Sequence, residues 1–208
     1  TGHFPYSLVV LILASTGLCT IYAVYLIRQY DLTLMLMFLG ALFWMVGNIL
    51  LLTRNFYPLS FPWWMAFLLF TIVAERLELS KFLPVTKANK NTLLIFLVIF
   101  LLGVLLPFHG YGTYFSGAGL FLISAWLLRF DVVRITIKKK GLTRFTGIAL
   151  LSGYVALIFD GIFLLIFPNT PFAYDAILHT FFLGFIFSMI FAHGPIIFPG
   201  VLGSSVKP

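Results

Sequence analysis

Long apolar runs recur along the whole chain and constrain its fold more than any other feature. Each run approaches the roughly 20 residues that an α-helix needs to cross the hydrocarbon core of a bilayer. The sequence therefore predicts an all-α, polytopic integral membrane protein with seven transmembrane helices. We expect these helices at about residues 6–28, 32–53, 60–79, 91–107, 113–130, 143–167 and 173–194.

The composition agrees with this class. Hydrophobic residues make up 62% of the chain and charged residues 9%, which excludes a soluble fold. Backbone polar groups in lipid must be satisfied within the protein, so helices are the expected spanning structure. We expect residues 1–208 to form a single transmembrane helical domain whose main partner is the lipid bilayer. Nucleic acid is not an expected partner, because the cations flank apolar helices and do not form a folded basic face.

The cations predict the orientation of the helices. Only Arg54 falls on one side of the predicted bilayer, whereas the loops and tail on the other side hold the remaining Lys and Arg residues. Cytoplasmic loops carry such an excess of basic residues, so we expect the N-terminus outside and the C-terminus in the cytoplasm. The basic side consists of Arg28, Arg76, Lys81, Lys87, Lys90, Arg129, Arg134, Lys138, Lys139, Lys140, Arg144 and Lys207.

Two segments predict contacts with lipid and with other helices. Between Arg129 and Arg144, six cations are interleaved with Val and Ile residues. This pattern predicts an interfacial extension of the fifth helix against anionic lipid. Ser116–Gly119 forms a small-residue patch, which predicts close packing of another helix against the fifth span.

The last span contains two histidines, His179 and His193, and is the segment where chemistry is most expected. A separation of fourteen residues predicts that the two side chains lie about 40° apart around an α-helix and about 21 Å apart along it. They would share a face without sharing a metal ion. Each could reach a different haem, whereas His193 has the alternative role of a cation at a helix C-terminus before Gly194 and Pro195.

A buried acid is predicted next to His179. Asp160 and His179 lie at similar depths from the connection between the last two spans, about 12 Å and 9 to 12 Å respectively. Neighbouring antiparallel helices pack together, so we expect Asp160 to form a hydrogen bond that orients the His179 ring, as carboxylates do for metal-ligating histidines. Asn48 is a further polar residue expected in this zone.

The outer side of the predicted bilayer gathers further histidines. His3 and His109 would lie there with His179, which predicts either a copper or zinc site or a pair of haem ligands. Solvated loop histidines are the alternative.

Enzymatic activity has little support in the sequence. Glu75, Arg76 and Glu78 are interpreted as interfacial ion pairing, and catalytic motifs for phosphate binding or nucleophilic attack are absent.

A family resemblance rests on small residues, a tyrosine and a histidine in the last two spans. The matching positions are Leu150–Tyr154, Leu157, Gly161, Ala176–His179, Gly184 and Met189. This pattern resembles the C-terminal helices of the NnrS family. The resemblance implies a bacterial inner-membrane protein that binds haem, and copper as a further option, in processes linked to nitric oxide. His179 is the ligand that the resemblance supports, and Met189 would lie close to the cofactor.

Three functional hypotheses follow. The first is a protein that holds haem b, or copper, through His179 in an electron-transfer or nitric-oxide-related role. The second is a cofactor-free accessory subunit that packs with other membrane subunits or forms a homodimer. The third is a proton-coupled carrier that uses Asp160.

Overall fold

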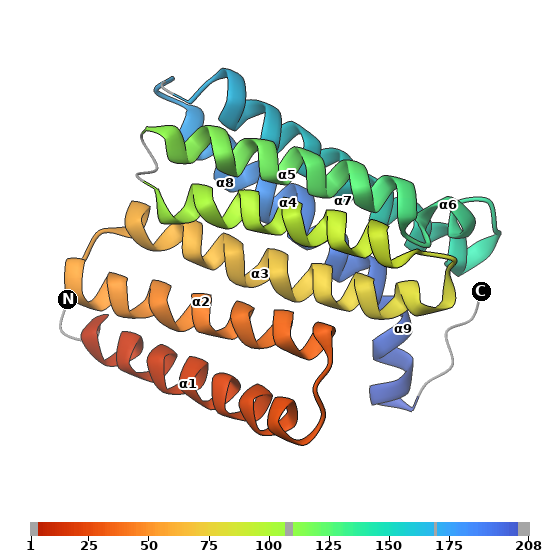
Figure 1. Cartoon of the computed structure of the whole chain (residues 1–208), viewed down its shortest axis with the longest axis horizontal. Helices are drawn as coiled ribbons and strands as arrows, with labels where there is room; N and C mark the ends of the chain where they lie inside the picture. The colour runs from red at the N-terminus through yellow and green to blue at the C-terminus, as the bar shows by residue number, and fades with distance from the viewer. Residues whose placement is uncertain (1–3, 107–109, 169, 204–208) are drawn as a thin grey trace. The chain divides into compact units, whose positions relative to one another are not determined.

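The computed structural model describes residues 4–106, 110–168 and 170–203, which are helical apart from short connections (Figure 1). Within these residues seven helices are long and apolar enough to cross a membrane, which confirms the predicted number. The long helices are α1 (Phe4–Arg28), α2 (Leu32–Arg54), α3 (Tyr57–Leu79), α4 (Lys87–Leu105), α5 (Tyr111–Phe130) and α7 (Gly141–Ile166). The seventh span, Ala173–Pro195, is composite.

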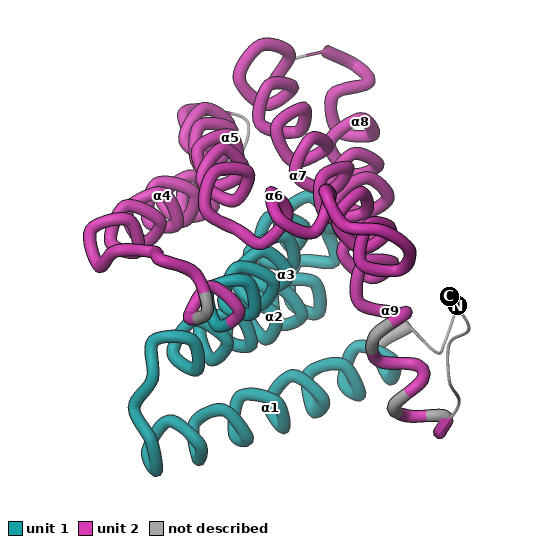
Figure 2. Tube along the Cα trace, turned by 90° about the vertical axis from the view of Figure 1, so that its right-hand side faces the viewer, with its two compact units in different colours: residues 1–78 teal, residues 79–208 magenta. Residues whose placement is uncertain are grey.

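The chain divides into two compact units, residues 1–78 and residues 79–208 (Figure 2). The first contains α1, α2 and nearly all of α3. The second contains α4 to α9 and carries both described histidines, so it holds most of the residues singled out by the sequence.

A buried asparagine links the three helices of the first unit. Asn48 of α2 is fully buried, and its Nδ2 donates to the Leu11 carbonyl at 3.3 Å and to Ser15 Oγ at 3.4 Å, both on α1. Its Oδ1 accepts a hydrogen bond from Trp64 Nε1 of α3 at 3.2 Å. Hydrogen bonds between helices hold spans together in lipid, where apolar contact alone is weakly selective. The hydrogen-bonding groups of Asn48 are thus used inside this unit.

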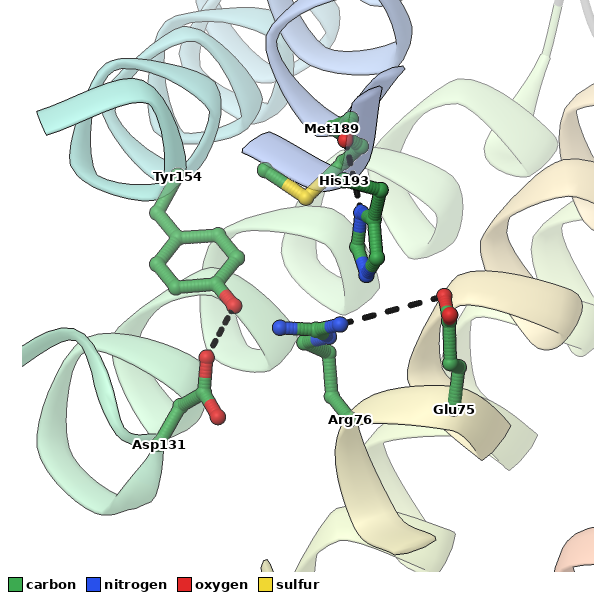
Figure 3. A network of polar contacts seen from close by, with 6 residues as sticks. All are labelled: Glu75, Arg76, Asp131, Tyr154, Met189 and His193. Carbon is green, nitrogen blue, oxygen red and sulfur yellow. Dashed lines mark hydrogen bonds and ion pairs between the residues drawn. The ribbon is translucent and has the colours of Figure 1, made fainter. Parts of the chain in front are cut away.

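The polar end of α3 contains the predicted ion pair. Arg76 and Glu75 approach to 3.9 Å (Figure 3). Thr33 of α2 donates to Glu78 Oε2 at 3.1 Å. The Arg76 side chain is 3% exposed, whereas that of Glu75 is 43% exposed. The prediction of ion pairing is confirmed, with Arg76 buried to a degree that its position at a helix end did not indicate.

Short polar turns separate the spans. Asp31 caps α2 by accepting from Thr33 N at 3.1 Å, and Thr86 caps α4 by accepting from Asn89 N at 3.2 Å. Asn55, with φ of 48°, ends α2 in the left-handed region, which asparagine tolerates better than most residues. These caps satisfy backbone groups at the helix ends, where the helices stop supplying their own partners.

In the second unit, α5 packs closely between α4 and α7. A Cβ placed on Gly119 would lie 2.6 Å from Phe100 Cα of α4, and one on Gly117 would lie 2.8 Å from the Gly161 carbonyl of α7. The backbones can approach this closely only because the side chains are missing. The predicted role of the Ser116–Gly119 patch in close helix packing is confirmed.

The basic segment after α5 differs from the prediction of a continuous extension. The helix ends at Phe130, because Asp131 is extended, with φ of −84° and ψ of 167°. A separate short helix, α6 (Val133–Thr136), follows and packs on α7, where a Cβ on Gly147 would lie 2.6 Å from Ile137 N. The chain therefore turns back at Asp131.

The seventh span is built from three helical pieces. These are α8 (Ala173–His179), the π-helical segment η2 (Thr180–Ile186) and α9 (Phe187–Leu202). All three pack against α7. Their inward residues include Ile177, Phe181, Phe185, Met189 and Ala192.

The close packing between α4 and α5 gives a direct test of the fold. A Cβ on Gly103 would lie 2.7 Å from the Gly112 carbonyl and closer still to Ser116. Gly103→Ala should therefore lower the free energy of unfolding by about 1–3 kcal/mol, the usual cost of overpacking a tight interface. Reversible unfolding in mixed micelles measures this change.

Gly17→Ala is the matched control, because a Cβ at Gly17 meets no atom within 4 Å. It should leave stability unchanged or slightly higher. Equal destabilisation by both substitutions would contradict the packing of α4 on α5.

Candidate functional site

Asp160 is a fully buried acid in the second unit. It is 0% exposed on α7, and neither carboxylate oxygen has a hydrogen-bond partner among the described residues. Gly153, Leu157 and Leu164 lie three, four or seven residues away and are buried on the same face of the helix. An acid on such a face is costly unless its charge is neutralised or used.

The contacts of α7 with the seventh span show which part of that span lies at the same level as Asp160. Ser152 donates to Ser188 Oγ at 3.2 Å, and a Cβ on Gly184 would lie 2.8 Å from Ala156 Cβ. These pairs define an antiparallel register. Continued by one turn of each helix, it places Asp160 at about the level of Thr180, where the π-helical segment begins.

The π-helical segment changes the directions in which side chains point around the axis of the seventh span. The Phe187 N–H bonds to the Phe182 carbonyl five residues earlier, so the segment holds about one residue more than an α-helix of the same number of turns. Phe181 and Phe185, both within this segment, are fully buried, with ring centroids 5.6 Å apart. Such segments frequently occur at functional sites.

His179 lies on the outer face of this span. It is exposed, between the buried residues Ile177 and Phe181, and its Nδ1 is 2.7 Å from the Asp175 carbonyl. A carbonyl only accepts, so Nδ1 carries a proton, and in the neutral ring Nε2 is then the nitrogen with the lone pair. The predicted hydrogen bond between Asp160 and His179 is wrong, because Nδ1 is used by Asp175 and both Asp160 oxygens lack a partner within the described part of the chain.

His193 lies on the other side of the span. It follows the fully buried Ala192 and is half-buried, and its Nδ1 donates to the Met189 carbonyl at 2.7 Å (Figure 3). The prediction that His179 and His193 share a face is wrong. The extra residue in the π-helical segment turns the helix beyond it back by about 100° around the helix axis. The two histidine side chains therefore lie roughly 140° apart around that axis.

Met189 has a packing role in the structure. Its side chain is 3% exposed, and its terminal methyl group lies against Gly153 of α7. Met189 is ten residues beyond His179 and on the inner face, so it lies near His193 in the helix and not near the exposed His179 ring. Its predicted place beside a cofactor held by His179 gains no support from these contacts.

The predicted outer histidine cluster rests on His3 and His109, which lie outside the described residues. Among residues 4–106, 110–168 and 170–203, no group of three or more His, Cys, Asp or Glu side chains is arranged to hold a metal ion. Asp160, His179 and His193 are thus separate groups and do not form one site.

A buried tyrosine–aspartate pair, which the sequence patterns do not predict, links α7 to the end of α5. Tyr154 of α7 is fully buried and donates from its hydroxyl to Asp131 Oδ2 (Figure 3). The Tyr154 carbonyl accepts a hydrogen bond from Ser124 Oγ of α5 at 2.6 Å. Tyr154 of α7 therefore makes one hydrogen bond to α5 and one to Asp131, the residue that follows α5. The signal in the sequence was an acid directly after the fifth span, in a segment otherwise rich in cations.

Among the described residues, seven helices have the length and apolar composition typical of a multi-pass helical membrane protein. The chain belongs to the family described as Domain of unknown function (DUF8744), whose model matches residues 4–207. No curated protein matches the chain, and no solved structure does. The resemblance to the NnrS family stays a prediction.

The Tyr154–Asp131 bond can be tested by its contribution to stability. Tyr154→Phe removes the donor and leaves a buried carboxylate oxygen without it, so we expect a loss of about 1.5–3 kcal/mol in the free energy of unfolding. Tyr114→Phe, at a 46% exposed position on α5, should change stability little. In a double-mutant cycle, Asp131→Ala, which removes both acceptor oxygens, should remove most of the effect of Tyr154→Phe; additive effects would contradict a direct bond.

Proposed function

We propose that this protein binds and releases a proton at Asp160 during proton-coupled transport across a membrane. The observation that carries the proposal is the complete burial of both Asp160 oxygens without a hydrogen-bond partner among the described residues. Ionisable residues inside membrane spans are costly to keep and are a recurring feature of proton relays and carriers.

The surroundings of Asp160 make its charge state consequential. The neutral acid is tolerated on an apolar helix face, whereas the carboxylate would be an unpaired buried charge. Loss of the proton therefore favours a different arrangement of the helices, in which the carboxylate meets water or a partner. This coupling between proton occupancy and conformation is what a proton-driven carrier requires.

The facing π-helical segment supplies an element that can change. Thr180–Ile186 holds an extra residue beside Asp160, and a shift of that residue along the helix alters which side chains face α7. Gly184 keeps the two helices close, since it meets Ala156 without a side chain of its own. We assign the conformational step of the cycle to this segment.

The proposed location follows from the charges. We place the protein in the bacterial inner membrane, with the basic ends of the helices in the cytoplasm and the N-terminus outside, on the excess of Lys and Arg on one side. The transported cargo is left open.

Proton flux into proteoliposomes tests the role of Asp160. With a pH-sensitive dye inside and an imposed membrane potential, the native protein should acidify the lumen, whereas Asp160→Asn should reduce the flux to that of protein-free liposomes. The variant should unfold with a similar free energy, because a neutral amide replaces a neutral acid of nearly the same size at a site where neither oxygen has a hydrogen-bond partner among the described residues. Asp175→Asn, at an exposed position of α8, is the matched control and should retain flux.

Infrared spectroscopy separates proton binding from transport. A carbonyl band from a protonated carboxylic acid should be present in the native protein and absent in Asp160→Asn. Flux that survives in Asp160→Asn, or a spectrum that is the same in both proteins, would overturn the proposal.

A second candidate function is haem binding through His179. The supporting observation is that Asp175 fixes the ring with Nε2 unprotonated on an exposed helix face, the atom that ligates a haem iron. Leu183, one turn further along and 57% exposed, provides apolar surface beside it. One ligand fits a five-coordinate haem b, or a haem whose second ligand belongs to another subunit or to a second copy of this chain. Bound haem would supply electron transfer or nitric oxide binding.

His193 and copper fit this candidate less well. His193 lies about 140° from His179 around the helix, so it would serve a separate haem if it served one. Copper coordination would need further donors, and the predicted ones, His3 and His109, lie outside the described residues.

Optical spectra test the haem candidate. Protein purified from haem-replete cells should show a Soret band and a reduced-minus-oxidised α-band that His179→Ala abolishes. His193→Ala is the matched control and should keep both bands, because its ring lies on a different face. A colourless, copper-free preparation of native protein would exclude both cofactors without affecting the proposal for Asp160.

A further inference from the structure

An apolar groove lies between α7 and α9 in the second unit, with a volume of about 570 Å³. Its walls include Leu142 and Phe145 of α7, and Ile190, Phe191, Pro195 and Phe198 of α9. The positions on α9 recur at i, i+1, i+4, i+5 and i+8, so one helix face lines the groove over roughly 12 Å. His193 lies on a different face of α9, which separates the groove from the histidine.

Proline accounts for the space along α9. Pro195 and Pro199 lie inside the helix, and each lacks the N–H that would bond to the carbonyl four residues earlier. Their rings also crowd that turn, which disfavours tight packing of α9 on α7. The seven long helices are expected to be surrounded by lipid, so a groove of this kind opens toward acyl chains.

The charges at the start of α7 identify the headgroup. Lys138, Lys139 and Lys140 are exposed and directly precede the helix whose first turn contributes Leu142 to the groove. Basic residues beside an apolar groove at a helix end form the arrangement that recognises anionic lipids. A zwitterionic lipid could fill the groove but would gain little from three ammonium groups.

We infer that the groove between α7 and α9 binds one acyl chain of an anionic phospholipid whose phosphate lies against Lys138–Lys140. The apolar walls provide burial for the chain, and the lysines provide selectivity for the headgroup. The site differs from the general attraction of a basic loop to a negative surface, because it holds a single lipid in a defined place. It is also independent of the proton role proposed for Asp160.

Native mass spectrometry of the detergent-solubilised protein tests this site. Phosphatidylglycerol and phosphatidylcholine with identical acyl chains are the probes. One phosphatidylglycerol should be retained per chain with an affinity about tenfold or more above that of phosphatidylcholine, given the contribution of several cations near one phosphate. Leu142→Trp should abolish retention by filling the groove, whereas Ile148→Trp, at a 49% exposed position of α7 outside the groove, should not.

A charge variant separates the headgroup contact from the fit of the chain and stays informative if Leu142→Trp does not fold. Lys139→Gln with Lys140→Gln should reduce the preference for phosphatidylglycerol about tenfold or more. Lys87→Gln with Lys90→Gln, at the start of α4, should leave it unchanged. Retention of both lipids with equal affinity, the absence of a discrete bound lipid, or an equal effect of the two lysine pairs would overturn the inference.

Discussion

In a bilayer, an apolar side chain gains little by leaving lipid for another helix. The contacts between these helices therefore depend on residues that allow close approach or hydrogen bonding. In the second unit, Gly103, Gly117 and Gly119 bring α5 against α4 and α7. In the first, Asn48 links α1, α2 and α3 through its amide. The positions of the buried groups follow from these contacts. Asp160 is next to Gly161, where α7 and α5 touch, so its burial belongs to this close packing.

The chemistry of the second unit is distributed and does not converge on one centre. Asp160 is buried on α7 without a hydrogen-bond partner among the described residues, His179 faces outward, and His193 lies on a different face of the seventh span. A redox centre would need several ligands directed at one point, whereas a proton site needs one acid and a neighbouring element that responds to its charge. The arrangement therefore favours proton coupling over a multi-ligand metal site among the described residues. Haem with one ligand from this chain is compatible with this arrangement, because such a haem needs only Nε2 of His179.

Several predictions depended on regular α-helical geometry and failed where the backbone departs from it. The angle between His179 and His193 was calculated for an uninterrupted helix, and the π-helical segment between them changes it. The orientation of His179 toward Asp160 was inferred from depth alone, but depth does not specify the direction of a side chain around its helix. The segment that forms the short helix α6 is predicted as an interfacial extension of the fifth helix, because a basic, partly apolar segment does not reveal the turn at Asp131.

The sequence by itself determined the class of the protein, the number of long helices and the residues worth considering, because apolar length and the positions of charges are local properties that the bilayer makes decisive. It also indicated the close packing at Ser116–Gly119, since small residues are a requirement of close helix contact. Only the tertiary structure decided that Asp160 has no hydrogen-bond partner among the described residues, that His179 faces outward and that Tyr154 meets Asp131. Those facts depend on the rotation and register of neighbouring helices, which are set by packing between residues far apart in the chain.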